Sequence, residues 1–341
     1  MHHTARDTWK AGRGMAERSF AKEVLKLRQE PGTRFEGEGI LAVTKALLQS
    51  GVAYVGGYQG APISHLMDVL GDAREILDEY GQHRRLHIPA ERPLTVFVDK
   101  RELVTLMTLG QQPELLVLGY LRNQRLVGQL DEIESITVDW EVGAAAVYTR
   151  HGLADLEART ARRVVTTGCG QGTVFGDLMG EVASLTLPPP AQARIRQSTL
   201  AAMLETMRQQ DSIHRQAGSV HGCALFQGGQ MLCFVEDVGR HNAIDTIAGW
   251  MWLHAVAGED KAFYTTGRLT SEMVMKSAHM GVPIVVSRNG VTHMGHELAT
   301  RLGMALFGRA ANKHFLCYTG FERFDSEPLP EPAAVRVVSA Q

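Results

Sequence analysis

The stretch Ala262–Ser287 reads AFYTTGRLTSEMVMKSAHMGVPIVVS and decides the fold. Its apolar runs predict a strand at Ala262–Thr265 and another at Pro283–Ser287, with a helix at Thr270–Met280 between them. The alternation continues on both sides, where two more helices and a strand are predicted near Asn242–Val256, Thr292–Leu302 and His314–Tyr318. Strands and helices that alternate in this way are typical of an α/β layered domain.

The segment before this stretch predicts further elements of the same domain. A hairpin is expected from Val220–Phe226 and Gln230–Glu236, because Gly228-Gly229 between them is a strong turn signal. A helix is expected near Ala193–Arg208. The run Pro188-Pro189-Pro190 predicts a stiff linker, which we interpret as a subdomain boundary.

A smaller, β-rich subdomain is predicted N-terminal to the prolines. Residues 93–109, PLTVFVDKRELVTLMTL, alternate like a hairpin that turns at Asp99-Lys100-Arg101. Pro113 favours a helix start, and that helix is expected to run through Gln124. Strands are predicted near Ser135–Asp139 and Ala144–Tyr148. We therefore divide the chain into residues 1–85, 86–187 and 188–325, followed by a proline-rich tail, 326–341, that is expected to be disordered.

Composition and charge exclude several classes of protein. The chain has 341 residues, of which 44% are hydrophobic and 21% charged, as expected for a globular protein with more than one domain. A formal net charge of −2 provides no overall field to attract nucleic acid. The start, MHHTARDTWK, lacks the apolar core of a secretory signal, and the longest apolar stretch, Ile244–Ala257, is too short and too polar to span a bilayer. We expect a cytoplasmic protein that binds neither nucleic acid nor membrane.

The four cysteines are scattered, at Cys169, Cys223, Cys233 and Cys317. No C-x-x-C pair occurs, so neither a zinc knuckle nor a disulfide framework is indicated, and all four are expected to be reduced. The histidines of residues 293–297, HMGHE, match neither H-E-x-x-H nor H-x-x-E-H, and His221-Gly222-Cys223 lacks the partners of a zinc deaminase site. We therefore predict no metal site.

Cys169 lies in the glycine-rich run Thr167-Gly168-Cys169-Gly170-Gln171-Gly172, after the apolar pair Val164-Val165, which we interpret as the end of a strand. Glycine lets such a loop adopt conformations closed to other residues and lets groups approach closely. An exposed thiol on this loop suits the transfer of sulfur from a donor to an acceptor. The alternative is that Cys169 is a small buried hydrophobic residue. The other three cysteines lie in apolar strand patterns that indicate core positions.

Three predicted strand-to-helix junctions each contain a glycine and an arginine. They are the segments that carry Arg240-His241, Arg268 and Arg288. Free N–H groups at a helix N-terminus and an added guanidinium bind phosphate, and ligands of open α/β sheets bind at such strand ends. Together the junctions predict an anionic ligand. The alternative is that the arginines only pair with acidic residues inside the fold, namely Glu236, Asp237 or Glu272.

Six segments together resemble the FdhD/NarQ family of accessory sulfurtransferases for formate dehydrogenase. In family order across residues 86–325, they are ERPLTVFVD-x-RELVTLM, TTGCGQG, HRQAGSVHGCALF, EDVGRHNAID, TTGRLTSEMVMKSAHMGVPIVVSRNGVT and LFGRAANKHFLCYTG. The resemblance implies a fold similar to cytidine deaminases without the zinc, plus a smaller β-rich part, in a homodimer. It implies that sulfur moves from a cysteine desulfurase, through a cysteine persulfide, to molybdenum bound by bis-molybdopterin guanine dinucleotide, which activates formate dehydrogenase.

The resemblance also assigns site residues. Cys169 matches the persulfide cysteine, and a basic run that by itself is typical of a solvated turn matches the cofactor-binding segment: Arg309, Ala310, Ala311, Asn312, Lys313 and His314. The chain departs from the family where Gly172 replaces a second loop cysteine, where Ala217–His221 replaces T-G-G-x-H, and where Thr246 replaces a lysine. The lost cysteine argues against a relay between two thiols, whereas a single persulfide needs only one nucleophile. The alternative function is a chaperone that binds the molybdenum cofactor without transferring sulfur.

The first 85 residues resemble a different family. Residues 35–70, with the segments GEG, AVTKALLQ and YVGGYQGAP, are similar to the opening of indolepyruvate and related 2-oxoacid:ferredoxin oxidoreductases, which starts a thiamine-diphosphate-binding domain. A helix is predicted at Ile40–Ser50, a strand at Ala53–Val55 and a second helix from Ser64. The resemblance stops near Tyr80–Arg85, without the rest of the diphosphate site. We interpret the segment as a fused remnant or a gene-model artefact; the alternatives are an interaction module and a fragment of a thiamine-dependent oxidoreductase.

Overall fold

Six strands form the larger sheet in a computed structural model that describes residues 73–152, 163–165, 173–175, 182 and 184–327. Their order is β11-β10-β12-β13-β14-β15. The neighbours β12, β13 and β14 run parallel, as expected for strands joined by helices, and the remaining pairs are antiparallel. The strands are β10 (His221–Gln227), β11 (Gln230–Asp237), β12 (Lys261–Thr265), β13 (Ile284–Ser287), β14 (Ala305–Ala311) and β15 (His314–Thr319).

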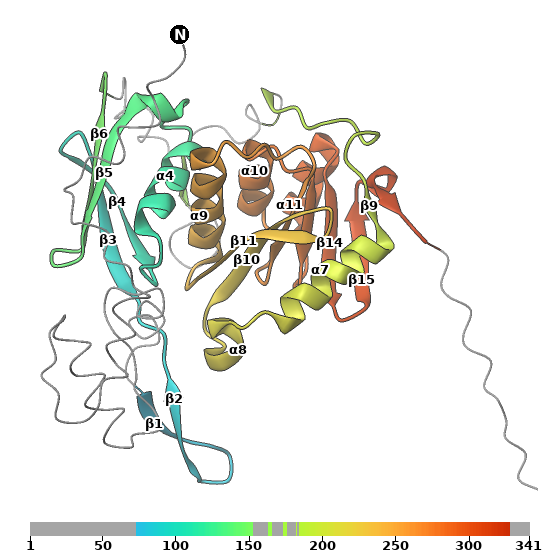
Figure 1. Cartoon of the computed structure of the whole chain (residues 1–341), viewed down its shortest axis with the longest axis horizontal. Helices are drawn as coiled ribbons and strands as arrows, with labels where there is room; N and C mark the ends of the chain where they lie inside the picture. The colour runs from blue at the N-terminus through green and yellow to red at the C-terminus, as the bar shows by residue number, and fades with distance from the viewer. Residues whose placement is uncertain (1–72, 153–162, 166–172, 176–181, 183, 328–341) are drawn as a thin grey trace, which may run out of the picture. The chain divides into compact units, whose positions relative to one another are not determined.

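Helices cover both faces of this sheet (Figure 1). One face carries α9 (Arg240–Leu253), α10 (Ser271–His279) and α11 (His293–Leu302), and the other carries α7 (Gln197–Gln209). Side chains alternate along each strand, so Phe263 and Val285 pack toward α9–α11, whereas Tyr264 and Val286 pack toward α7. The sheet is therefore buried on both sides.

A second sheet of four strands has the order β4-β3-β6-β5, with β3 and β6 parallel. Its elements are β3 (Arg92–Val98), β4 (Arg101–Thr108), β5 (Ile133–Asp139), β6 (Ala144–Thr149) and the covering helix α4 (Pro113–Asn123). The turn between β3 and β4 is Asp99-Lys100, and both residues have positive φ, 46° and 69°. Such a turn matches the twist of the strands that it joins.

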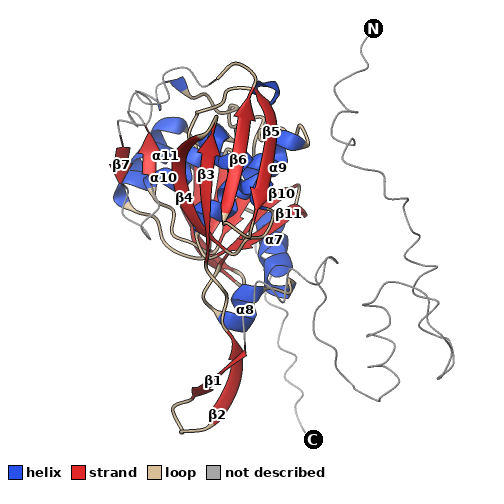
Figure 2. Ribbon diagram, turned by 90° about the vertical axis from the view of Figure 1, so that its left-hand side faces the viewer, coloured by secondary structure: helices blue, strands red, loops and turns tan. Residues whose placement is uncertain are grey.

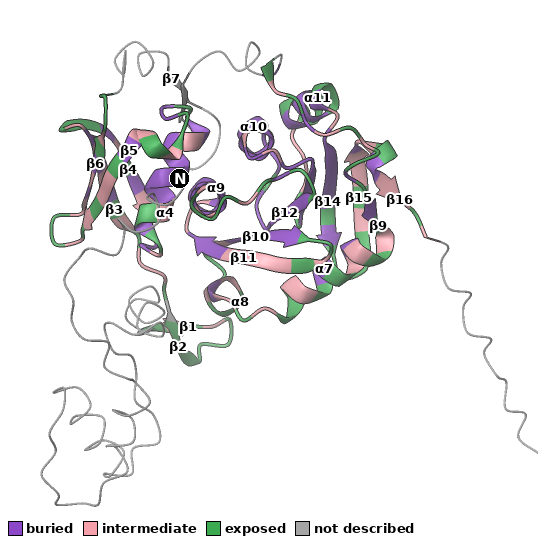
Figure 3. Cartoon of the chain, turned by 45° about the horizontal axis from the view of Figure 1, so that its top comes forward, coloured by how far each residue is buried: buried purple, intermediate pink, exposed green. Residues whose placement is uncertain are grey.

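Helices α4 and α9 join the two sheets and lie side by side, largely buried (Figures 1 and 3). Glycines permit their close approach. A Cβ atom on Gly119 would lie 1.7 Å from the carbonyl oxygen of Asp245, and one on Gly249 would lie 2.1 Å from that of Leu115. No other residue type fits at these two positions without moving the helices apart.

A buried arginine ties the end of the described chain to the start of the α/β layer. Arg323, in the 3-10 helix Phe321–Arg323, donates hydrogen bonds to the carbonyl oxygens of Gly303 (2.6 Å), Ala193 (3.2 Å) and Pro188 (2.6 Å). Next to it, the short strands β9 (Ile195–Arg196) and β16 (Phe324–Asp325) pair in parallel. The proline run predicted as a linker is thus bound to the α/β layer.

The strands β1 (Ala73–Leu77) and β2 (His83–His87) form a ribbon of their own (Figure 2). The predicted boundary between residues 85 and 86 falls inside β2. Across the described ranges, no helix combines the length and the apolar character needed to cross a membrane.

The predicted mixed α/β class is confirmed, and most predicted helices and strands of residues 93–319 are found. Two expectations are corrected. Helix α7 begins at Gln197 rather than near Ala193, because Ile195–Arg196 form β9. Strand β14 was not predicted; in its sequence, ALFGRAA, a glycine and an arginine interrupt the apolar run.

Other expectations stay predictions. They include the similarity of the layering to cytidine deaminases and the division of the chain into four segments. The elements predicted at Ile40–Ser50, at Ala53–Val55 and from Ser64 lie outside the described residues, as does the tail beyond Glu327.

Candidate functional site

The carboxyl ends of β12, β13 and β14 meet at one edge of the larger sheet, where open α/β sheets bind ligands. His221 at the start of β10 and Asp237 at the end of β11 pair with each other at the same edge. The three predicted junctions follow β11, β12 and β13. The structure therefore brings Arg240, Arg268 and Arg288 to one edge, which we call the carboxyl edge.

Hydrogen bonds join the loops of the carboxyl edge. The backbone N–H of Arg288 donates to the carbonyl of Thr265 (3.1 Å), and the side chain of Asn289 donates to the carbonyl of Thr266 (2.6 Å). The N–H of Arg309 donates to the carbonyl of Asn289 (2.9 Å). The second junction, the third junction and the start of the basic run thus form one continuous rim.

The four arginines differ in burial. Arg268, Arg288 and Arg309 are exposed, whereas Arg240 is only 3% exposed. Its side chain lies against Gly267, where a Cβ atom would come within 2.5 Å of the arginine Cδ. Within the described part of the chain, none of the four forms an ion pair with a carboxylate. The alternative pairing with Glu236, Asp237 or Glu272 is therefore not observed.

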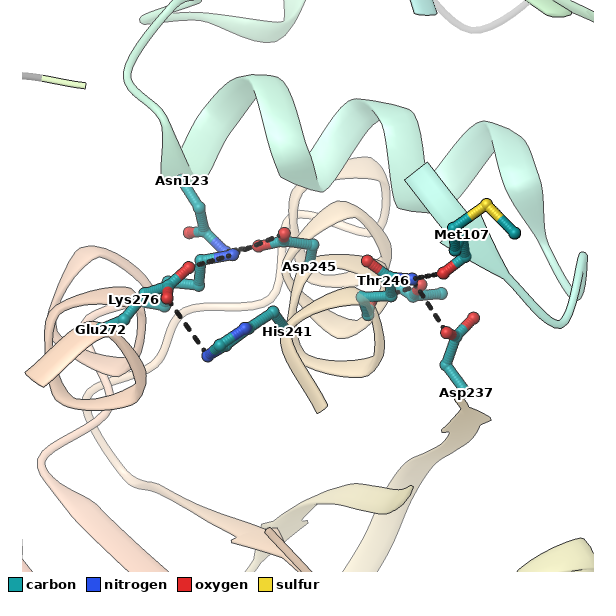
Figure 4. Close-up of polar contacts among 9 residues, drawn as sticks. Met107, Asn123, Asp237, His241, Asp245, Thr246, Glu272 and Lys276 are labelled. Atoms are coloured by element: carbon teal, nitrogen blue, oxygen red, sulfur yellow. Dashed lines mark hydrogen bonds and ion pairs between the residues drawn. The ribbon is translucent and has the colours of Figure 1, made fainter. Parts of the chain in front are cut away.

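Asp237 instead anchors the first junction to the four-stranded sheet. Its carboxylate accepts hydrogen bonds from the hydroxyl of Thr108 and from the N–H of Leu109 (3.2 Å). Asn242 donates both to Asp237 (2.9 Å) and to the carbonyl of Met107 (2.6 Å) (Figure 4). Burial outweighs these hydrogen bonds and raises the pKa of Asp237 to about 6.

His221 lies at the carboxyl edge as a neutral imidazole. Its Nδ1 is 3.2 Å from the hydroxyl of Thr266, which also accepts the N–H of Gly222 (3.1 Å). Burial, followed by the charge of Arg240, lowers the pKa of His221 to about 4, and Arg268 adds to the effect. His221 is therefore uncharged at neutral pH, and both arginines lie near it.

Behind the edge, a buried chain of polar side chains links three helices (Figure 4). Asn123 of α4 donates to Asp245 of α9 (2.7 Å), which accepts a second bond from Lys276 of α10 (2.6 Å). Lys276 lies 3.5 Å from Glu272, and Glu272 lies 3.2 Å from Nε2 of His241. His241, predicted as a ligand contact, is thus placed inside this buried chain.

The ionisation of the buried chain follows from its contacts. Burial lowers the pKa of His241 to about 2, so the ring is neutral. Burial opposes the charge of Lys276, but Asp245 and Glu272 outweigh it and raise its pKa. Thr246, where the family has a lysine, is buried nearby and donates to the carbonyl of Asn242 (2.9 Å).

A cleft of about 310 Å³ opens on the α7 side of the carboxyl edge. Two aromatic rings, Phe234 and Tyr264, lie in its wall, and Arg288 reaches it from the third junction. The cleft is lined by Met207, Arg208, Gln210, Ser212, His214, Arg215, Gly222, Phe234, Glu236, Tyr264, Thr266 and Arg288. Sequence reasoning did not assign the lining residues of α7 and α8 (Ile213–Ala217), although the segment HRQAGSVHGCALF begins at His214.

The run Arg309–His314 ends β14, turns and begins β15. Arg309 and Asn312 have positive φ, 52° and 55°. Arg309, Ala311, Asn312, Lys313 and His314 are exposed, whereas Ala310 is 1% exposed and packs in the core on the α7 side. A ligand at this run would therefore meet the side chains of the other residues.

Three of the four cysteines are described, and burial raises the pKa of each thiol. The pKa is about 12 for Cys223 and Cys233 and about 11 for Cys317. The core position expected for Cys223 is confirmed, whereas Cys233 and Cys317 are half-buried. None of the three is a thiolate at neutral pH.

The predicted sulfur-carrying loop joins two paired strands. The strands β7 (Arg163–Val165) and β8 (Thr173–Phe175) are antiparallel, with Val165 opposite Thr173, so the predicted strand end is confirmed. Cys169 and Gly172 lie in the connection, residues 166–172, outside the described residues. Among the residues that are described, no group of three or more His, Cys, Asp or Glu side chains is placed to hold a metal ion.

Known proteins resemble most of the chain. A family model, the FdhD/NarQ family, matches residues 89–325. The sulfur carrier protein FdhD of Bacillus licheniformis is 31% identical over 240 residues, and that of Bacillus subtilis is 30% identical over 233 residues; each match covers 68% of this chain and 88% of the relative. A crystal structure described as a candidate formate dehydrogenase accessory protein from Desulfotalea psychrophila is 26% identical, with a TM-score of 0.59 over 74% of this chain and 97% of that one.

Proposed function

The chain belongs to the FdhD/NarQ family, and from this premise we propose that it is a sulfur carrier for formate dehydrogenase. Cys169 accepts sulfur from a cysteine desulfurase as a persulfide and passes it to molybdenum bound by bis-molybdopterin guanine dinucleotide. Relatives named sulfur carrier protein FdhD support the carrier role. The structural relative, described as a formate dehydrogenase accessory protein, supports the enzyme that is served.

The transfer has two steps at sulfur. In the first, the thiolate of Cys169 attacks the outer sulfur of the desulfurase persulfide; a new S–S bond forms, the old one breaks, and the desulfurase cysteine leaves as a thiolate. In the second, the S–S bond of the Cys169 persulfide breaks and its electron pair stays on Cys169. The two electrons that make the transferred atom a sulfide come from the molybdenum of the substrate, which is oxidised by two units.

The described cysteines support Cys169 as the carrier. A nucleophilic cysteine must be a thiolate, and burial keeps Cys223, Cys233 and Cys317 protonated at neutral pH. Cys223 also donates to the hydroxyl of Thr265 (3.2 Å), deep in the sheet. None of these thiols combines the acidity and the access that transfer between two proteins requires.

One observation carries the cofactor part of the proposal: arginines that form no ion pair with any described carboxylate converge on the carboxyl edge. Arg268 and Arg288 are exposed there, and the hydrogen bond from Arg309 to Asn289 places the basic run beside them. Guanidinium groups bind phosphate in a bidentate manner. The cleft beside Arg288 has Phe234 and Tyr264 for contact with a base.

The decisive test is mass spectrometry of the intact chain after incubation with a cysteine desulfurase and cysteine. We expect the wild type to gain the mass of one sulfur atom, and Cys169→Ala to gain none. Cys317→Ala is the matched control and is expected to gain the sulfur like the wild type, because the pKa of Cys317 is raised. An adduct that persists in Cys169→Ala would show that another residue is the carrier.

A cofactor-binding chaperone is the second candidate, because Gly172 stands where many members of the family have a second cysteine. Under this alternative the chain binds GDP, a fragment of the cofactor, but gains no sulfur from the desulfurase. Both measurements on one preparation separate the two functions. Persulfide formation with activation of formate dehydrogenase supports the carrier, whereas GDP binding without persulfide supports the chaperone.

A further inference from the structure

The first turns of α9 and α10 meet at the carboxyl edge. His241 is the second residue of α9, Glu272 is the second residue of α10, and their side chains lie 3.2 Å apart. Among the described residues, the N-cap positions Gly239 and Thr270 provide no side-chain capping hydrogen bond. The positive dipole ends of two helices therefore lie close together here.

Two buried side chains at this place have unused hydrogen-bonding groups. In the described structure, Nε and Nη2 of Arg240 and the hydroxyl of Thr270 have no hydrogen-bond partner. Arg240 is 3% exposed and Thr270 is 7% exposed, so water does not freely replace a partner. Buried donors are normally satisfied, because leaving one unpaired destabilises the fold.

The neighbouring helix shows what a satisfied N-terminus looks like. Thr292 occupies the same N-cap position of α11 as Thr270 does in α10, and its hydroxyl accepts the N–H of Gly295 (3.2 Å). Arg323 is likewise as buried as Arg240, but its guanidinium donates to three carbonyls. A threonine at the N-cap and a buried arginine are thus satisfied elsewhere in this fold, and the unused hydrogen-bonding groups of Arg240 and Thr270 set the starts of α9 and α10 apart.

We propose that the space between the first turns of α9 and α10 is a subsite for a phosphate or diphosphate group, held by Arg240, Thr270 and the free N–H groups. The aliphatic part of Arg240 packs on Gly267, in the loop that leads into α10. A phosphate offers several acceptor oxygens and a charge that suits both dipoles. A hydroxyl and an arginine fork supply the donors.

The carboxylate of Glu272 does not exclude an anion from this subsite. Glu272 lies within the buried chain, 3.5 Å from the ammonium of Lys276 and 3.2 Å from His241. The ammonium of Lys276 therefore offsets part of its charge. Next to the subsite, burial and the charges of Arg240 and Arg268 keep His221 neutral.

The inference rests on the proposed function in one respect, since the diphosphate of the guanine dinucleotide is one source of such a group. A free phosphate or pyrophosphate is the other. Calorimetry with inorganic pyrophosphate, GDP and guanosine distinguishes them. Binding of pyrophosphate shows that the phosphates suffice, and binding of GDP without pyrophosphate shows that the subsite serves a nucleotide.

Two pairs of variants in the full chain test the subsite. Thr270→Val and Arg240→Lys remove donors that have no partner among the described residues, so we expect affinity for GDP or pyrophosphate to fall about tenfold or more, with little change in melting temperature. Thr292→Val and Arg323→Lys remove groups that are in use, so we expect a lower melting temperature and unchanged affinity. If Arg240→Lys does not fold, Thr270→Val decides.

The opposite pattern would overturn the proposal. If Thr270→Val and Arg240→Lys keep wild-type affinity for both ligands, or if the wild type binds neither GDP nor pyrophosphate, there is no phosphate subsite. Persulfide formation on Cys169, measured on the same preparations, does not depend on this subsite. If the wild type binds neither ligand but still forms the persulfide, the subsite is refuted and the carrier function is not. If it binds the ligands but forms no persulfide, only the carrier function is refuted.

Discussion

Charged residues buried inside the protein are tolerated because they are paired. Lys276 is 3% exposed and lies between the carboxylates of Asp245 and Glu272. Burying any one of these charges alone would destabilise the fold. Here each charged group contacts a polar or oppositely charged neighbour, from Asn123 at one end to His241 at the other. These buried polar contacts thus fix the positions of α4, α9 and α10 relative to one another beneath the carboxyl edge.

Removing Lys276 leaves two buried carboxylates without their shared cation. We expect Lys276→Met to lower the free energy of unfolding by roughly 3–5 kcal/mol, measured by urea denaturation. Arg208→Met is the control, because its ion pair with Glu205 is largely exposed, and we expect a loss of no more than about 1 kcal/mol. Equal effects in the two variants would contradict the role assigned to the buried chain.

His241 makes stability depend on pH. Its pKa in the folded chain is lowered by burial to about 2, against 6.5 for an ordinary histidine, so on acidification the unfolded chain binds a proton that the folded chain does not. The stability from this residue is present above the ordinary pKa and is lost as pH falls. Between about pH 6 and 4 we expect His241→Gln to lower the slope of unfolding free energy against pH by about 1.4 kcal/mol per pH unit.

The control for this slope is His293→Gln. The side chain of His293 is 89% exposed, on the first turn of α11, so its substitution is expected to leave the slope unchanged. A slope that is the same in His241→Gln as in the wild type would mean that the folded chain takes up the proton at His241 in this range.

At the scale of elements, the contact between α4 and α9 depends on two glycines. In Gly119→Ala or Gly249→Ala, the new Cβ would overlap a backbone oxygen of the facing helix. We therefore expect the free energy of unfolding to fall by roughly 1–3 kcal/mol, although alanine has the better helix propensity. Gly290→Ala is the control, because no atom of the described residues, apart from its chain neighbours, lies within 4 Å of its added Cβ. Thermal unfolding of the three variants checks this expectation.

The junctions between strands and helices make a separate prediction. Arg268 is exposed at the second junction and has no carboxylate partner among the described residues. We expect Arg268→Ala to weaken GDP binding by about tenfold, or about 1.4 kcal/mol, with little change in melting temperature. Arg301→Ala, another exposed arginine but in the last turn of α11, is expected to bind GDP like the wild type.

The result that would contradict this prediction is specific. An unchanged GDP affinity accompanied by a large drop in melting temperature would mean that Arg268 serves the fold, which was the alternative interpretation of the junctions.

At the scale of the whole molecule, the FdhD/NarQ match begins at residue 89, and β1 pairs only with β2 in the described structure. We therefore expect a truncated chain that starts at Ile88 to keep the melting temperature and the persulfide formation of the full chain. A cut at Arg85 would leave part of β2, so Ile88 is the better start. A chain that starts at Asp99 is the control: it lacks β3, an inner strand of the four-stranded sheet, and is expected not to fold.

Loss of formate dehydrogenase activation in the chain that starts at Ile88, with persulfide formation intact, would show that the N-terminal segment has a function of its own. Light scattering on the full chain and on the chain that starts at Ile88 measures whether each forms the homodimer that the family resemblance implies.

The sequence by itself determined the α/β class, the hairpin at Gly228-Gly229 and the three junctions, because each depends on neighbours along the chain. Apolar runs of strand length and helix length alternate in Ala262–Ser287, and a glycine with an arginine follows each predicted strand end. Such local patterns fix φ and ψ preferences and side-chain direction, which is what a sequence records directly. The glycine-rich loop indicated Cys169, and family resemblance, which also works on sequence alone, assigned the cofactor-binding role to the basic run Arg309–His314.

Only the tertiary structure decided which of these residues are buried and what they contact. Both Arg240 and Arg268 follow a glycine at a predicted strand-to-helix junction. In the structure Arg240 packs against Gly267 and is buried, whereas Arg268 is exposed. The bonds from Asn123 to Asp245 and from Thr108 to Asp237 join residues more than a hundred positions apart. Burial and pairing are set by contacts between distant segments, and so only the fold shows which polar groups at α9 and α10 have no partner in the described part of the chain.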